Sequence, residues 1–130
     1  MKWRLRAPAT SANLGPGFDC LGVALDLWNE VEVDFCEGEG QLALQLEGEG
    51  AGQLPHDENH LMLKVAFDYL GRHGVSRWPS LRICCLNRIP LARGLGSSAA
   101  TRVLGVMLGQ LLHRGQADLD ELLTWAGHLE

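Results

Sequence analysis

The chain has 130 residues, a formal net charge of −5, 46% hydrophobic residues and 21% charged residues. This length fits one domain with a buried core, and the apolar runs fall short of the ~20 residues that a membrane helix needs. The acidic balance and the lack of a lysine and arginine cluster argue against a nucleic-acid surface. No secretory signal pattern opens the sequence, so we expect a cytoplasmic protein without membrane or nucleic-acid partners.

The strands are predicted by alternation of apolar and polar residues. Pro8 is expected to end the first of them, and residues 8–19 to form a polar, glycine-rich loop. Glycine-rich turns flank a later strand and predict a meander. The predicted strand segments are 2–7, one or two strands within 20–37, 41–47 and 81–86.

Helical spacing of apolar residues predicts three helices. The first is capped by Asp57 or Asn59 and ends near Leu70, and the second runs from about Ser97 to about His113. The third begins at a capping-box-like pair, Asp118 and Glu121. Small residues in the second helix are expected to allow close approach to a sheet; they are Ala99, Ala100, Gly105 and Gly109.

These elements predict an α+β fold, a mostly antiparallel sheet of about four to five strands with the helices on one face. The four cysteines are interpreted as reduced thiols, since the neighbours Cys84 and Cys85 would point to opposite faces of a strand. The five histidines lack ligand spacing, so solvated loop or helix-end positions are expected for all of them.

A glycine- and serine-rich segment joins the last strand to the second helix, and its pattern favours binding of phosphate. Glycine leaves backbone amides open to a ligand, and a helix N-terminus attracts anions. A side chain at Gly96 is therefore expected to enter the phosphate path. In the alternative interpretation the segment is a structural turn in which Ser97 caps the helix. The segment comprises Pro90, Leu91, Ala92, Arg93, Gly94, Leu95, Gly96, Ser97, Ser98, Ala99 and Ala100.

The loop predicted at 8–19 contains Asn13 and Asp19, whose amide and carboxylate could bind a zwitterionic ligand. From spacing alone, the preferred interpretation is structural, with both side chains capping backbone groups.

Two motifs together resemble a known superfamily. Residues 8–19 (PATSANLGPGFD) and 90–100 (PLARGLGSSAA) resemble the first two signatures of the GHMP superfamily of small-metabolite kinases. With Cys20-Leu21-Gly22 behind it, the first motif looks like that of the homoserine kinase branch. Other branches usually carry a lysine near residues 11–13. The resemblance covers essentially the whole chain.

The resemblance implies that residues 1–130 form an ATP-binding domain like the second domain of ribosomal protein S5. A ferredoxin-like C-terminal domain would follow, so the chain is expected to be a truncated piece. The 94–100 loop would wrap the phosphates of ATP, and Asn59 would lie near the nucleotide base. Ser98 and Glu130 would form the catalytic magnesium site, and Asn13 and Asp19 would hold the amino-acid substrate.

The implied reaction is ATP-dependent phosphorylation of L-homoserine to O-phospho-L-homoserine, on the route to threonine. Another kinase of the superfamily acting on a different small alcohol remains an alternative, as does a non-catalytic nucleotide-binding module. The 130 residues alone are expected to be inactive, because further family contacts would lie beyond Glu130. The assembly state, a homodimer included, is left open.

Overall fold

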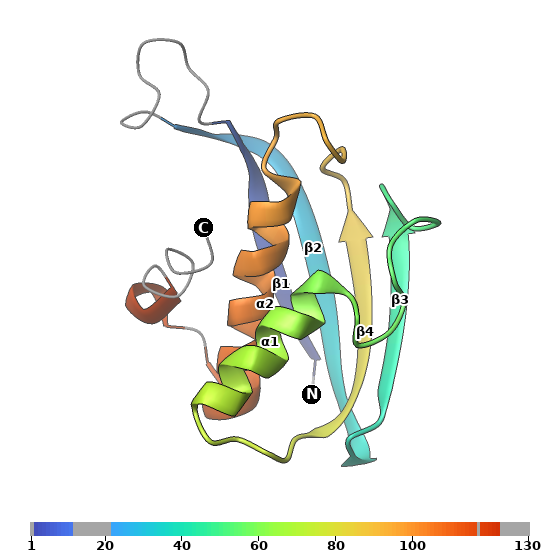
Figure 1. Ribbon diagram of the computed structural model, residues 1–130, viewed down its shortest axis with the longest axis vertical. Helices are drawn as coiled ribbons and strands as arrows, with labels where there is room; N and C mark the ends of the chain where they lie inside the picture. Colours follow the sequence, from blue (N-terminus) through green and yellow to red (C-terminus); the bar gives the residue numbers. More distant parts are fainter. Residues whose placement is uncertain (1, 12–21, 117, 123–130) are drawn as a thin grey trace.

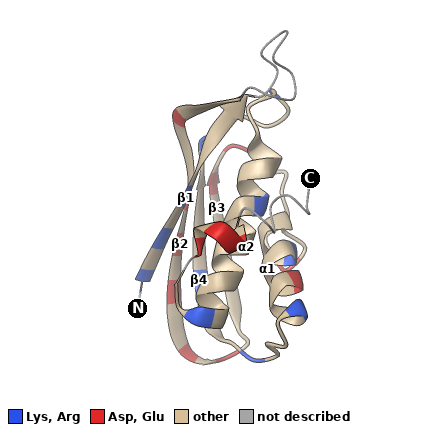
Figure 2. Cartoon of the chain, turned by 90° about the vertical axis from the view of Figure 1, so that its left-hand side faces the viewer, with Lys and Arg blue, Asp and Glu red and all other residues tan. Residues whose placement is uncertain are grey.

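The computed structural model describes residues 2–11, 22–116 and 118–122. The strands form one sheet in the order β1-β2-β4-β3, and α1 and α2 lie together on one face of it (Figure 1; Figure 2). The predicted α+β class, with a mostly antiparallel sheet, is confirmed. The elements are β1 (Lys2–Ser11), β2 (Val23–Glu39), β3 (Leu42–Gly48), α1 (Leu61–Arg72), β4 (Pro79–Asn87) and α2 (Ser97–Arg114).

The prediction that the first strand ends at Pro8 is wrong. β1 continues to Ser11, with a shift of register between Pro8 and Thr10. Proline has no N–H to donate, but among the described strands β1 lies at the edge of the sheet and pairs with β2 alone, so the sheet tolerates proline there. Thr10, which the sequence places in a loop, therefore belongs to the sheet.

The predicted meander is also wrong, because β3 pairs with β4 and runs parallel to it. The turn after β2 does not close a hairpin. Instead Gly40 donates its N–H to the carbonyl of Trp78 at 3.2 Å, and Gln41 accepts from Leu81 N–H at 2.8 Å. β4 is thereby placed between β2 and β3, and α1 makes the crossover that parallel neighbours require.

α1 begins later than predicted, because a cap at Asp57 or Asn59 would start the helix three residues or one residue before Leu61. Its N-cap is His60, whose Nδ1 accepts from Met62 N–H at 3.2 Å. Asp57 caps nothing in the helix, because its carboxylate accepts from Asn59 N–H at 2.9 Å within the preceding turn. At the other end α1 runs to Arg72.

The glycines of α2 face α1, not the sheet as predicted. A Cβ at Gly105 would lie 2.7 Å from the carbonyl oxygen of Met62, and one at Gly109 would lie 2.7 Å from a ring carbon of Tyr69. The two helices are therefore packed at a distance that only glycine allows at these positions.

The predicted start of the last helix at Asp118 is confirmed, but the predicted pairing with the Glu121 side chain is not, because Asp118 N–H donates to Gln110 instead. Asp118 accepts from the N–H groups of Asp120 and Glu121 at 3.0 and 3.2 Å and caps a helical turn at 119–122. The Glu121 carboxylate accepts from the Tyr69 hydroxyl and from Arg114, the latter at 2.8 Å. These contacts fix the turn to both helices, and the rest of the predicted helix lies outside the described residues.

The core lies between the sheet and the helices. Charged side chains of β1 and β2 alternate with the buried ones and so occupy the other face, as in the ion pairs Arg4–Glu32 and Arg6–Glu30. Cys36, Cys84 and Cys85 are free thiols, as predicted, and Cys20 lies outside the described residues. Neither described helix is long and apolar enough to cross a membrane.

Candidate functional site

The segment between β4 and α2 is held at both ends by strands. At its entry Asn29 of β2 accepts from the N–H groups of Arg88 and Ile89 at 2.8 and 2.9 Å. At its exit Thr10 of β1 donates its N–H to Leu95 at 2.9 Å. Two strands far apart in the sequence thus determine where the glycine-rich loop lies in front of α2.

The loop contains three residues with positive φ: Ala92 at 56°, Gly94 at 71° and Gly96 at 74°. The expectation that a side chain at Gly96 would enter the phosphate path is wrong, because a Cβ there would collide with the hydroxyl of Thr10 in β1. A Cβ at Gly94 would meet nothing within 4 Å. Gly96 is therefore required for packing against the sheet, and Gly94 for its backbone conformation alone.

The N-terminus of α2 opens on a hollow of about 530 Å³ that the loop encloses. The N-cap of α2 is Gly96, and no side chain forms a capping hydrogen bond, so the alternative in which Ser97 caps the helix is wrong. The first N–H groups of a helix have no intrahelical partner, and the helix dipole is positive at this end. Arg93 and Arg102 also line the hollow, and neither forms an ion pair with another described residue. The arrangement suits an anion.

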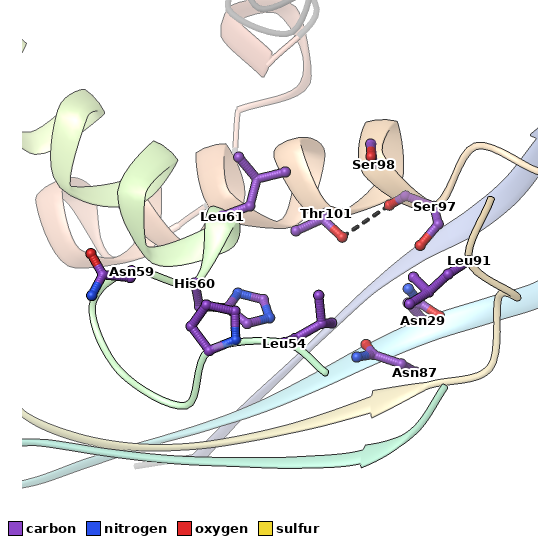
Figure 3. Close-up of a pocket in the computed structure, with 11 residues that line it drawn as sticks. Asn29, Leu54, Asn59, His60, Leu61, Asn87, Leu91, Ser97, Ser98 and Thr101 are labelled. Carbon is purple, nitrogen blue, oxygen red and sulfur yellow. Dashed lines mark hydrogen bonds between the residues drawn. The ribbon is translucent and has the colours of Figure 1, made fainter. Parts of the chain in front are cut away.

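A second cavity, of about 200 Å³, adjoins this hollow, and both are lined by Leu91, Ser97 and Ser98 (Figure 3). Leu54 and Leu61 supply apolar surface, and the other side chains are mostly amides and hydroxyls. A ligand could thus place an anionic group at α2 and a flat, partly polar group in the second cavity. The remaining residues that line the second cavity are Asn29, Pro55, Asn59, His60, Asn87 and Thr101.

The structure brings together most of the predicted nucleotide-binding residues. Residues 90–99 line the hollow, and Asn59 lines the second cavity. Ala100 is buried in the core at 4% exposure. The predicted substrate and metal residues Asn13, Asp19 and Glu130 lie outside the described residues. Within the described part of the chain, no three His, Cys, Asp or Glu residues gather as a metal site would require.

Seven of the eleven residues that line the second cavity were not predicted from the sequence, and two of these seven, Asn29 and His60, are buried polar residues. Asn29 is 2% exposed. It lies two residues before Val31 and four before Val33 in β2, and side chains at this spacing share one face of a strand, so Asn29 faces inward with the two buried valines. His60 is 5% exposed, so the expectation of a solvated position is wrong for it. Burial, and to a lesser extent His56, lowers the pKa of His60. Its imidazole is therefore neutral near pH 7.

Fold and site together define a class of protein. A sequence model described as the GHMP kinases N terminal domain matches residues 60–130, and the chain belongs to this family. The mevalonate kinase of Methanococcus jannaschii shares the fold, with a TM-score of 0.75 at 15% identity over 100% of this chain and 46% of its own.

More similar relatives carry one particular name. The homoserine kinases of Cutibacterium acnes and Streptomyces coelicolor are 46% and 47% identical to the chain, each over 98% of it. The match covers 44% and 41% of those relatives, so the chain spans less than half of their length. A crystal structure of homoserine kinase from Cytophaga hutchinsonii matches with a TM-score of 0.76 and 32% identity, over 96% of this chain and 39% of its own.

Proposed function

We propose that the chain is the N-terminal part of a homoserine kinase, which transfers the γ-phosphoryl group of ATP to the hydroxyl of L-homoserine. The products are O-phospho-L-homoserine and ADP, in the cytoplasm and on the route to threonine. The observation that carries the proposal is the hollow at the N-terminus of α2 with a second cavity directly beside it. The names of the similar relatives supply the substrate.

The triphosphate is assigned to the hollow. Backbone N–H groups of the first turn of α2, from Ser97 to Ala99, would bind its oxygens. Arg93 and Arg102 add positive charge at the same place, which a chain of net charge −5 needs for an anionic ligand. The adenosine is assigned to the second cavity, with Asn59 on its wall.

Magnesium is included in the proposal. Ser98 is exposed at the start of α2 and lines both spaces, so its hydroxyl oxygen fits a magnesium ligand beside a phosphate. Glu130 is the carboxylate proposed to join it. When bound, the ion would neutralise charge on the transferring phosphoryl group. Asn13 and Asp19 are proposed to hold the amino and carboxylate groups of homoserine.

Catalysis in this proposal depends on alignment and not on a covalent intermediate. Phosphoryl transfer needs stabilisation of charge and an in-line hydroxyl, and protein groups supply mainly positioning. The loop, held by Asn29 and Thr10, gives α2 a fixed place from which to hold the phosphates. No nucleic acid or membrane takes part.

The test is a substrate comparison with the full-length protein, ATP and Mg²⁺. L-Homoserine, mevalonate and shikimate are offered separately, and ADP formation is measured. We expect turnover with homoserine to exceed turnover with the other alcohols by orders of magnitude. Preference for another alcohol would indicate a different kinase of the family, and ATP binding without turnover would indicate a non-catalytic module.

A further inference from the structure

His60 combines features that no structural role fully explains. It is the N-cap of α1, and its Nδ1 accepts a hydrogen bond from Met62 N–H at 3.2 Å. An imidazole nitrogen that accepts a hydrogen bond carries no proton, so in the neutral ring the proton is on Nε2. The cap therefore turns Nε2 into a hydrogen-bond donor.

This donor has no acceptor in the described part of the chain. Two buried side-chain nitrogens lack a hydrogen-bond partner among the described residues, Trp3 Nε1 and His60 Nε2. Of these two residues, only His60 lines the second cavity (Figure 3). Buried polar groups are nearly always paired in native proteins, and each exception calls for an explanation. A ligand that brings an acceptor into the cavity would supply the partner.

We infer that His60 is a specificity-determining residue, whose Nε2–H donates to a ring nitrogen of a purine base held in the second cavity. The inference rests on the proposed function, since it concerns the nucleotide of that same site. It assigns the role to His60 and not to Asn59, whose side chain is exposed and can hydrogen-bond to water instead. A buried donor discriminates more strongly, because it stays unpaired when the wrong base is bound.

The purine fits the rest of the wall. Leu54 and Leu61 offer apolar surface to a flat ring. The Asn29 Oδ1 already accepts from Arg88 and Ile89, so this amide can only donate, whereas the Asn87 amide can both donate and accept at the edges of the ring. With its proton fixed on Nε2, His60 can only donate, so it selects a base with an acceptor at that place. The Asn87 amide adapts to either polarity and selects less.

The experiment measures binding to the full-length protein by isothermal titration calorimetry. The ligands are ATP, its 1-deaza, 3-deaza and 7-deaza analogues, and inorganic tripolyphosphate. Each analogue replaces one ring nitrogen by C–H and so removes one acceptor. We expect one of the three analogues to bind roughly three- to tenfold more weakly than ATP, the loss of one hydrogen bond.

His60→Asn completes the test. Asparagine is a good N-cap and keeps an acceptor for Met62 N–H, but its amide does not reach the position of Nε2. The variant should bind ATP more weakly by the same factor and should no longer distinguish the sensitive analogue. His113→Asn makes the same chemical change near the C-terminal end of α2, away from the cavity, and should behave as the parent.

The outcomes separate the two proposals. If the parent binds all three analogues as tightly as ATP, or if His60→Asn still distinguishes them as the parent does, the role of His60 is wrong. The first of these results needs no variant and so does not depend on folding of His60→Asn. If neither ATP nor tripolyphosphate binds, the proposed function itself fails.

Discussion

Gly96 and Gly94 look equivalent in the sequence, but they meet different surroundings. Both have positive φ, at 74° and 71°. A Cβ at Gly96 collides with Thr10, whereas a Cβ at Gly94 lies in open space. The two positions therefore allow backbone strain and steric overlap to be separated.

We predict that Gly94→Ala lowers the free energy of unfolding by about 1 kcal/mol, the cost of a left-handed backbone for a residue with a Cβ. Gly96→Ala adds overlap with β1 and should lower it by about 3 kcal/mol. Urea unfolding of both variants measures the difference. Equal losses would show that Thr10 moves aside and that the loop is not held against β1.

The burial of His60 also predicts how the stability of the protein depends on pH. Its pKa is lowered in the folded protein by burial and then by His56, from an ordinary value of 6.5. The unfolded chain binds this proton more readily than the folded one, so the stability contributed by neutral His60 is present above about pH 6.5 and is lost as pH falls below it.

The measurement compares the parent with His60→Asn at about pH 7.5 and about pH 5.5. The free energy of unfolding of the parent should fall more across this interval than that of the variant. The comparison cancels the other titrating groups, since both proteins share them. A larger fall in the variant would mean that the folded protein favours protonated His60, contrary to its buried, cap-accepting position.

At the scale of elements, two helix glycines should respond to alanine with opposite signs. Gly71 lies inside α1, and a Cβ there would meet nothing within 4 Å, so Gly71→Ala should stabilise by about 0.5–1 kcal/mol through helix propensity. Gly105→Ala gains the same propensity but forces a Cβ to within 2.7 Å of the Met62 carbonyl oxygen, and overpacking should give a net loss of about 1–2 kcal/mol. Thermal and urea unfolding would check both, and stabilisation by both changes would contradict the close packing of α1 on α2.

Elements that depend on local pattern were predicted well from the sequence. The apolar spacing of α2 and the alternation around Val31 and Val33 gave the correct element type, because each pattern reflects one buried face. The predictions were wrong where a segment distant in the sequence determines the structure. Pro8 stays in a strand because β1 is an edge, and β3 pairs with β4 because the turn at Gly40 bonds to the start of β4.

In the candidate site, too, the part formed by one continuous segment could be predicted and the part assembled by tertiary packing could not. The hollow at the N-terminus of α2 could be predicted, since glycines, serines and an arginine before a helix lie within one continuous segment. The second cavity could not, because its wall is assembled by tertiary packing. Asn29 comes from β2, Asn87 from the end of β4 and His60 from the cap of α1, and no spacing in the sequence joins them.

At the scale of the whole molecule, the proposed function requires an acidic chain to bind a highly charged anion at one place. The net charge of −5 opposes such a ligand at long range, and the N-terminus of α2 with Arg93 and Arg102 must overcome it locally. Binding of ATP should therefore be confined to this end of α2. Salt should weaken it, because the arginines are partly exposed and their charges are screened.

Binding of the phosphates at the N-terminus of α2 can be observed through the amide resonances of α2 in the isotopically labelled full-length protein. On titration with ATP, and separately with tripolyphosphate, the N–H signals of Ser97, Ser98 and Ala99 should shift and saturate together. The amide of Gly115, at the other end of α2, should stay in place. Saturable shifts that gather elsewhere, on the charged outer face of the sheet for example, while residues 97–99 do not respond, would contradict the assignment of the phosphates to this helix.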